Sequence, residues 1–151
     1  MSGNVSVIIQ NGILLFKGRY HNRIHESYLP ISLSNNVKRA KVLDHNIFYI
    51  STNDELFYLN PALESVRLAP NTAVKDCAFY GGKLYIIDTE GTAYFLGSFE
   101  DDKLVFRRLT MSPVPQPMSG QASVTLERIF LFETCLLALD NLGNLWGNDV
   151  S

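Results

Sequence analysis

Few residues of this chain stand at a spacing that could do chemistry. His21 and His25 lie four residues apart with Glu26 next to the second one. Such a pair can hold a metal ion when it falls on one face of a helix. The surrounding residues show no helical periodicity, and Arg23 would repel a cation. We therefore expect these histidines to lie in a solvated loop, and we expect neither a metal site nor a cofactor.

Nucleophilic catalysis is not indicated either. Cys77 and Cys135 both lie within apolar runs, where a free cysteine behaves as a small buried hydrophobe. Two cysteines make no disulfide framework, which favours the cytoplasm or the nucleus. Gly81-Gly82 has no helix after it that could complete a phosphate-binding loop. The sequence thus predicts no catalytic residue and no enzyme.

Composition narrows the class of protein further. The 151 residues include 13 basic and 15 acidic side chains, and 46% of them are apolar. This apolar content suits one folded domain, whereas a sequence-independent grip on nucleic acid needs clustered cations. Arg107 and Arg108 cannot form one patch on a strand, because adjacent residues point to opposite faces. No apolar run approaches the ~20 residues of a membrane-spanning helix. We expect neither nucleic acid nor a membrane as a partner.

The strongest signal is internal repetition. Residues 37–59 align without a gap on residues 74–96, and this second copy aligns without a gap on a third copy from Leu126 to Trp146. An incomplete copy, without its leading strand, opens the chain at Val5. Repetition at such intervals predicts a repeated structural unit.

Two columns of the repeat predict its turns. Glycine, or aspartate as a poorer substitute, suits a tight turn with a positive φ. The residues of this turn column are Gly12, Asp54, Gly91 and Gly143. Slightly earlier in three of the copies stands a residue whose side chain could accept hydrogen bonds from the backbone of the turn. These residues are Ser51, Asp88 and Asp140.

Each copy contains short apolar strands separated by turns. Four antiparallel strands in ~40 residues, repeated along the chain, are typical of the blades of a β-propeller. We expect an all-β fold in a single domain, 1–151, with copies at about 1–33, 34–70, 71–110 and 124–148. A small β-sandwich or an open barrel is the alternative, but neither explains gapless repeats.

The last copy resembles a known repeat. Residues 137–148 read Leu-Ala-Leu-Asp-Asn-Leu-Gly-Asn-Leu-Trp-Gly-Asn. This segment resembles the repeat of the regulator-of-chromosome-condensation type of propeller, and residues 85–97 are similar to it. The usual Gly and His before the Leu-Ala-Leu strand are absent, since Phe132-Glu133-Thr134 stands there. The resemblance covers residues 37–148 and implies a propeller scaffold. It also permits guanine-nucleotide exchange on a small GTPase by a protruding loop.

The copies do not add up to a closed ring. The first lacks its leading strand and the last has no room after Trp146 for its final one, whereas propellers close with ~4–8 blades. We expect completion by a second copy, by a partner chain or by further sequence, and a compact four-bladed ring is the alternative. The apolar edges that need covering lie near 5–16 and 126–148.

An insertion at 111–123 separates the third copy from the last. Its prolines stand at alternate positions, which stiffens a chain toward polyproline II. A long loop on a rigid scaffold is often functional. The sequence therefore predicts a non-enzymatic scaffold for protein–protein interactions, with nucleotide exchange on a small GTPase as the alternative. The candidate partner-binding residues are Pro113, Pro115, Gln116, Pro117, Met118, Phe130, Phe132 and Trp146.

Overall fold

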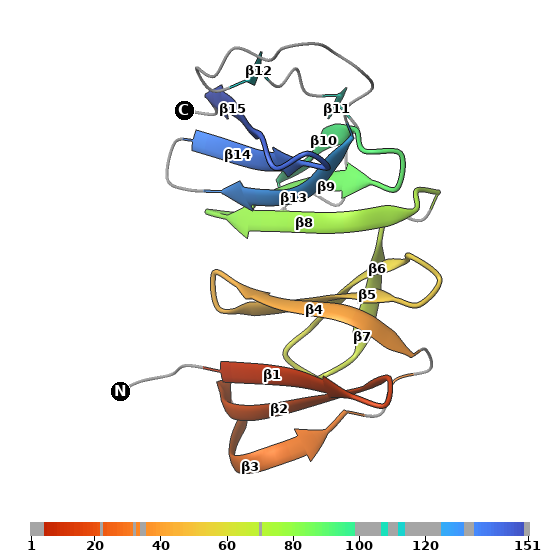
Figure 1. The fold of residues 1–151 in the computed structure, drawn as a ribbon. Helices are drawn as coiled ribbons and strands as arrows, with labels where there is room; N and C mark the ends of the chain where they lie inside the picture. The colour runs from red at the N-terminus through yellow and green to blue at the C-terminus, as the bar shows by residue number, and fades with distance from the viewer. Residues whose placement is uncertain are drawn as a thin grey trace. The chain divides into compact units, whose positions relative to one another are not determined.

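The computed structural model describes residues 5–21, 23–31, 33, 36–69, 71–98, 107–108, 112–113, 125–131 and 135–149. These residues form four antiparallel sheets, coloured along the chain in Figure 1. The described segments contain no helix that could cross a membrane. The all-β fold expected from the repeats is confirmed.

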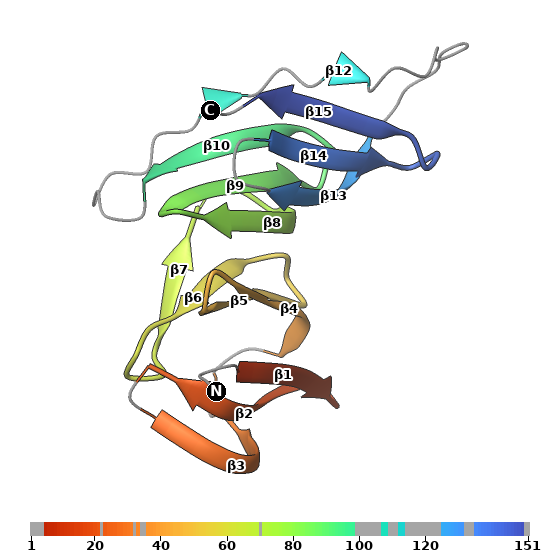
Figure 2. The same cartoon turned by 90° about the vertical axis from the view of Figure 1, so that its left-hand side faces the viewer.

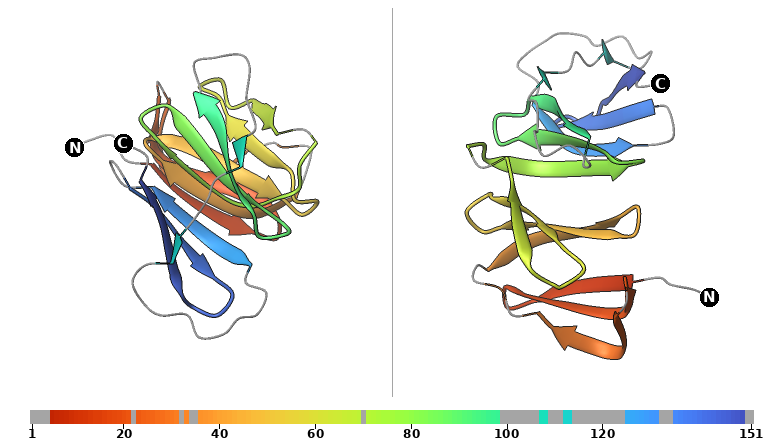
Figure 3. Two further views of the ribbon diagram at one scale, coloured as in Figure 1. Left: turned by 90° about the horizontal axis from the view of Figure 1, so that it is seen from above. Right: turned by 180° about the vertical axis from the view of Figure 1, so that it is seen from behind.

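Unit 1, Met1–Ala73, contains the first two sheets. The first sheet has three strands in the order β1-β2-β3, and the second has four in the order β4-β5-β6-β7. Consecutive strands pair with one another, so each sheet is a series of hairpins (Figure 3). The strands are β1 (Val5–Gln10), β2 (Ile13–Tyr20), β3 (Arg23–Pro30), β4 (Val37–Leu43), β5 (Asn46–Ser51), β6 (Leu56–Leu59) and β7 (Ser65–Leu68).

Unit 2, Val74–Ser151, contains the third and the last sheet. The third sheet has the order β11-β10-β9-β8, and the last has the order β12-β15-β14-β13. The strands are β8 (Val74–Tyr80), β9 (Lys83–Asp88), β10 (Ala93–Ser98), β11 (Arg107–Arg108), β12 (Ser112–Pro113), β13 (Leu126–Leu131), β14 (Cys135–Asp140) and β15 (Leu145–Asp149).

The two sheets of unit 1 share one hydrophobic core. Leu14 and Phe16 of β2 belong to the same buried cluster as Ile47 of β5 and Leu59 of β6. Tyr20, at the end of β2, is also fully buried in this cluster. Its hydroxyl group donates a hydrogen bond to the carbonyl oxygen of Leu59 and accepts one from the backbone N–H of Ile47 at 3.0 Å. A neutral hydroxyl therefore joins the first sheet to the second.

The two sheets of unit 2 are joined differently. β13 lies beside β8 (Figures 1 and 2). Ile129 and Leu136 of the last sheet share a buried cluster with Tyr85 and Ile87 of the third. Within this contact the Oδ2 atom of the buried Asp76 accepts a hydrogen bond from the backbone N–H of Ile129 at 2.9 Å. A carboxylate thus takes the role that a hydroxyl group has in unit 1.

The predicted turn column is confirmed. All four residues of the column have a positive φ, between 61° and 88°. The second column also acts as predicted, because its side chains accept hydrogen bonds from the turn backbone. Ser51 Oγ accepts from the N–H groups of Asn53 and Glu55, both at 3.2 Å. Asp88 Oδ1 accepts from those of Glu90 at 3.1 Å and Thr92 at 2.9 Å. The repeat therefore follows the sequence alignment down to individual turns.

The strand count needs one correction. Among the residues that the structure describes, the first sheet has no leading strand, as the sequence indicated. The last sheet, however, has a fourth strand, because β12 pairs with β15 through Ser112 opposite Gly147 and Pro113 opposite Trp146. The expectation that the last copy has no final strand was wrong. Its final strand precedes the other three in the chain, and residues 112–113 lie in a strand rather than in a loop.

Candidate interaction site

The register of the first sheet separates its two faces, because residues directly opposite in paired strands share a face. Val7 pairs with Phe16 and Ile9 pairs with Leu14, so all four side chains are on the face that carries the core of unit 1. The apolar side chains on the opposite face define the first-sheet outward face. These residues are Ile8, Ile13, Leu15, Ile24 and Tyr28.

The first-sheet outward face is open to solvent. The exposed fractions are 41% for Ile8, 48% for Ile13, 63% for Ile24 and 39% for Tyr28. With Ile9 and Leu29 included, this one sheet carries six of the ten large hydrophobic residues that are exposed in the described chain. Single exposed apolar residues are normal on a protein surface, whereas a cluster marks an interaction surface.

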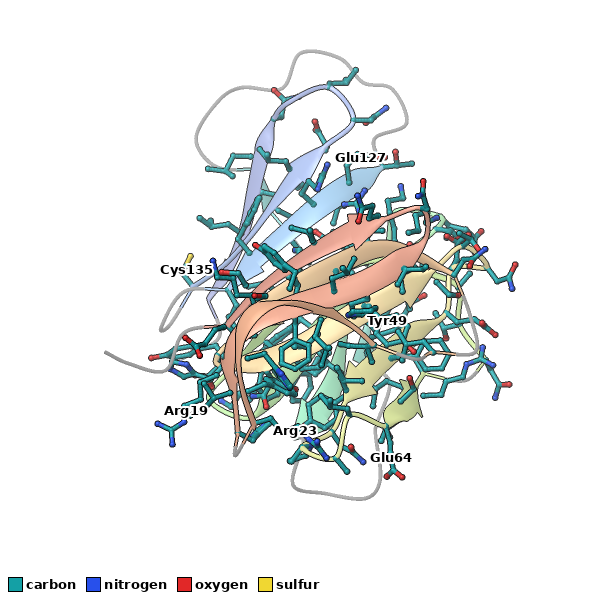
Figure 4. The ribbon with its side chains drawn as sticks, turned by 90° about the horizontal axis from the view of Figure 1, so that it is seen from below. Arg19, Arg23, Tyr49, Glu64, Glu127 and Cys135 are labelled. Carbon is teal, nitrogen blue, oxygen red and sulfur yellow. The ribbon has the colours of Figure 1, made fainter. Side chains whose placement is uncertain are left out.

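Basic side chains accompany these apolar groups. The ammonium group of Lys17 lies 5.8 Å from the ring centroid of Tyr28, within the range of a cation–π interaction. Arg19 stands opposite Ile24 in the register, and Figure 4 shows its side chain projecting away from the sheet. The first-sheet outward face is therefore amphipathic.

β1 forms one edge of this sheet, and β3 forms the other. Within the described chain β1 pairs only with β2, whereas β5, β9 and β14 each have a leading strand on their other side. The first and third sheets correspond in how they meet the sheet that follows. Val37 N–H donates to the carbonyl of Gly12 at 2.8 Å, and Leu126 N–H donates to the carbonyl of Gly91 at 3.1 Å. Such an edge offers alternate backbone N–H and C=O groups to another strand.

The last sheet has an outward face as well. Ile129 pairs with Ala138 and Leu131 pairs with Leu136, and these side chains belong to or pack against the core of unit 2. The opposite side defines the last-sheet outward face, with Phe130 39% exposed and the others partly exposed. In Figure 4 the sulfur of Cys135 points away from the ribbon. The residues of this face are Phe130, Cys135, Leu137, Leu139 and Leu145.

The turn of the last sheet is bare where the equivalent turns are covered. A Cβ atom added to Gly91 would lie 2.8 Å from Thr125 Cα and 2.9 Å from the backbone nitrogen of Leu126. At Gly12 it would meet the side chain of Asn36 at 3.1–3.3 Å. At Gly143 it would meet no atom within 4 Å. The first two turns receive the segment that enters the following sheet, and the third receives none from the described chain.

Asp140 fixes this turn from within. Its Oδ1 atom accepts hydrogen bonds from the N–H groups of Leu142 and Asn144, both at 2.8 Å, and its Oδ2 atom accepts one from Trp146 Nε1 at 2.9 Å. Burial by itself raises the pKa of this carboxyl group, but the hydrogen bonds from Trp146 and from the turn outweigh it and hold the pKa below its usual value. The carboxylate is a structural anchor of the turn.

The structure separates the predicted partner-binding residues. Phe130 lies on the last-sheet outward face, whereas Trp146 lies on the other face of the same sheet, against the core of unit 2. Pro113 lies in β12, at the edge of that sheet. Pro115, Gln116, Pro117, Met118 and Phe132 lie outside the described residues.

The histidines are arranged differently from our expectation. His25 lies in β3 rather than in a loop, and its ring meets Phe16 edge-on with 5.0 Å between centroids. His21 occupies the preceding turn, with its ring 4.4 Å from that of Tyr20. Among the residues that the structure describes, no three His, Cys, Asp or Glu side chains come together as a metal site would require.

Sequence reasoning located the apolar edge of the first copy but not its outward face. The run Val7-Ile8-Ile9 is apolar on both sides of the strand, so it does not show which side is buried. The signal lay further along β2, where polar Lys17 and Arg19 alternate with aromatic Phe16 and Tyr20. This alternation places Ile13 and Leu15 on the same side as the two charged residues. Pairing these residues with β1 would have placed Ile8 and Ile13 together on the outside.

No protein-family model and no curated protein matches this chain. Solved structures do. Human WBSCR16 is 14% identical with a TM-score of 0.67, and the match covers 97% of this chain and 45% of that one. YCF48 bound to D1 peptide is 9% identical with a TM-score of 0.65, covering 100% and 49%. BamB from Moraxella catarrhalis is 13% identical with a TM-score of 0.56, covering 94% and 41%.

These similar structures are β-propeller proteins. The chain spans about half the length of WBSCR16 and YCF48. At this level of identity the likeness concerns the fold alone. The four antiparallel sheets of this chain accordingly have the fold of β-propeller blades.

Proposed function

We propose that this chain is a non-enzymatic interaction scaffold that binds another polypeptide at the first sheet. The observation that carries the proposal is that, within the described part of the chain, the first sheet has three strands and no leading strand, whereas the other three sheets have four. Ile9, on the core side of β1, is exposed at this open edge. Backbone pairing at an open edge, with pockets for alternate side chains, is a common way to bind an extended segment.

The side chains of β1 predict the side-chain pattern of the partner strand. Val5 and Val7 pack against the core of unit 1 and stay partly exposed, and Ile9 follows on the same side of β1. A strand paired with β1 would extend this face, so every second side chain of the partner should be apolar. YCF48, a similar structure, is described as bound to a D1 peptide, which supports peptide binding on this fold. Nucleotide exchange on a small GTPase stays a prediction, and no contact among the described residues favours it.

The test compares two exposed positions of similar size in unit 1. Ile9, 37% exposed, lies at the free edge, and Val66, 42% exposed, lies in β7 of the second sheet. The chain is purified with its partners from its native source, and the mass of the complex and the amide exchange of β1 are measured. We expect slow exchange in β1 within the complex and fast exchange in the isolated chain. Ile9→Lys should weaken binding at least about tenfold, since a buried lysine has no partner there, and Val66→Lys should not.

Two results would contradict this proposal. One is a native complex in which the amides of β1 exchange as fast as in the isolated chain. The other is equal binding by the Ile9→Lys and Val66→Lys variants.

A further inference from the structure

The contact between neighbouring sheets repeats in both units. In each copy, the third residue after the turn-column residue faces the preceding sheet. Phe57 in the second sheet belongs to the core of unit 1, and Trp146 in the last sheet packs against the core of unit 2. The second residue faces the following sheet: Leu14 and Ala93 are buried in the same two cores. Within each unit, the second-residue face of the earlier sheet therefore packs against the third-residue face of the later sheet.

Among the described residues, the two outward faces are the members of this series that have no facing sheet within their own unit. Leu15 in the first sheet is equivalent to Phe57 and Trp146, so the first-sheet outward face is of the kind that packs against a preceding sheet. Leu145 in the last sheet is equivalent to Leu14 and Ala93, so the last-sheet outward face is of the kind that packs against a following sheet. Both leucines are partly exposed.

We propose that the last-sheet outward face packs against the first-sheet outward face of a second copy of this chain. The inference uses a different surface from the β1 edge and stands independently of the strand addition described above. The contact continues an interface that each unit already contains, with Leu137, Leu139 and Leu145 meeting Ile8, Ile13 and Leu15 of the second copy.

A second copy is the occupant because one chain carries both complementary faces. Such a head-to-tail contact joins two different faces. Two copies carry four outward faces in total, and all four are covered only when the contact forms twice. The matched portions of WBSCR16 and YCF48 are about half of those chains, so similar proteins contain about twice this length of chain in one molecule.

The area of the outward faces agrees with a dimer in which the head-to-tail contact forms twice. Strands about 4.8 Å apart with about 3.3 Å per residue give a three-stranded face of roughly 300 Å². Four such faces amount to roughly 1,200 Å², which is the lower end of the range for stable interfaces. One contact alone would bury about half of this area, which is typical of weak encounters.

The first experiment is sedimentation of the purified full chain at micromolar concentration. We expect a dimer for the wild type and a monomer for either Ile13→Lys or Phe130→Lys, since each places a charge in both contacts of the pair. Val66→Lys, which adds the same charge at a similarly exposed position outside both faces, should remain dimeric. Circular dichroism checks that each variant is folded.

Mixing the two monomeric variants tests the head-to-tail geometry. In the mixture, the intact last-sheet outward face of the Ile13→Lys chain can still meet the intact first-sheet outward face of the Phe130→Lys chain. We expect a mixed pair that is at least about tenfold weaker than the wild-type pair, because one contact of two is kept. An interface between two identical faces would give no such rescue.

The native Cys135 on the last-sheet outward face offers a second measurement that needs no destabilising charge. Cysteine introduced as Ile8→Cys, Ile13→Cys or Ile24→Cys should form an intermolecular disulfide with Cys135 at one or more of these positions, and Val66→Cys should form none. The second cysteine, Cys77, is buried.

A monomeric wild type, a dimer unaffected by both lysine variants, or a mixture without rescue would overturn the inference. A monomer that still shows slow β1 exchange in its native complex would leave the proposed strand addition intact. Failure of one proposal is thus separable from failure of the other.

Discussion

Units 1 and 2 join their sheets and hold their turns with polar groups of different charge. In unit 1 the hydroxyl group of Tyr20 joins the sheets, and the hydroxyl group of Ser51 accepts the backbone bonds of the turn. In unit 2 these roles fall to the carboxylates of Asp76 and Asp140. A charge-assisted hydrogen bond is stronger than a neutral one, but it depends on the protonation state. At the turn, where Ser51 and Asp140 share one column, the repeat fixes where a backbone group needs an acceptor and leaves the charge of that acceptor open.

A salt bridge adds to this difference. Lys75 Nζ lies 2.9 Å from Glu127 Oε2 and donates to the carbonyl of Leu126 at 3.3 Å, so it links β8 to β13 within unit 2. The hydrogen bond from Lys75 holds the pKa of the Glu127 carboxyl group below its usual value. In unit 1 Lys38, at the position equivalent to Lys75, instead pairs with Asp54 in the turn of its own sheet.

We expect the largest effect on the free energy of unfolding when glycine is replaced in three equivalent turns. Gly91→Ala should cost about 4 kcal/mol, because a Cβ atom would overlap the backbone at Thr125 in addition to the strain of a positive φ. Gly12→Ala should cost about 2 kcal/mol, because only the movable side chain of Asn36 is in the way. Gly143→Ala should cost about 1 kcal/mol of backbone strain. Urea unfolding of the three variants measures the order of these losses in the free energy of unfolding. Equal losses would contradict the difference between the covered turns and the bare turn.

The next effect compares the two kinds of turn acceptor. Asp140→Ala removes three hydrogen bonds in unit 2 and should lower the free energy of unfolding by about 3 kcal/mol, whereas Ser51→Ala in unit 1 should cost about 1 kcal/mol. Trp146 is the single tryptophan of the chain, so its fluorescence reports unit 2. Asp140→Asn keeps an oxygen acceptor and should recover part of the loss. A larger loss from Ser51→Ala would reverse the comparison.

The smallest effect is the dependence on pH, which should have opposite signs in the two units. Because the folded pKa of Asp140 is lowered, its contribution is present above the unfolded value of about 3.9 and is lost as the pH falls through the folded pKa. Burial raises the pKa of Tyr20, so its contribution is present below about 10 and is lost as the pH rises above that value. We expect about 1 kcal/mol at each end of the range.

Residue-resolved amide exchange separates the units in this experiment. Unit 2 should loosen first in acid and unit 1 first in alkali. Tyr20→Phe should reduce the alkaline dependence of unit 1, to which Tyr49 and Tyr58 also contribute because burial raises the pKa of both. It should leave the acid dependence of unit 2 unchanged. Acid weakening of both units in parallel would show that Asp140 does not set the difference.

Much of the fold could be predicted because the determinants are local. A positive φ requires Gly or a short polar residue, so the column from Gly12 to Gly143 marks the same turn in every copy. The acceptors Ser51, Asp88 and Asp140 stand within four residues of the N–H groups that they bind. Such signals are readable without any knowledge of the tertiary structure.

The remaining features depend on pairing between distant segments. Ser112–Pro113 is too short to show a strand pattern, and its pairing with β15 follows only from the assembled sheet. The faces of Phe130 and Trp146 depend on the register of β13, β14 and β15, and the register includes a bulge between Leu126 and Arg128. The sequence therefore indicated an apolar last copy but not that these two aromatic residues lie on opposite faces.

The position of β12 has a consequence for folding during synthesis. In unit 1 every strand pairs with its neighbour in the chain, so both sheets can form progressively as residues leave the ribosome. β12 emerges before β13 and β14 but must wait for β15, which contains the residues that it pairs with. Until then the last sheet has no outer edge strand, and its apolar strands are available for wrong pairing. Translation stalled before Leu145 should accordingly yield a folded first half next to an aggregation-prone second half.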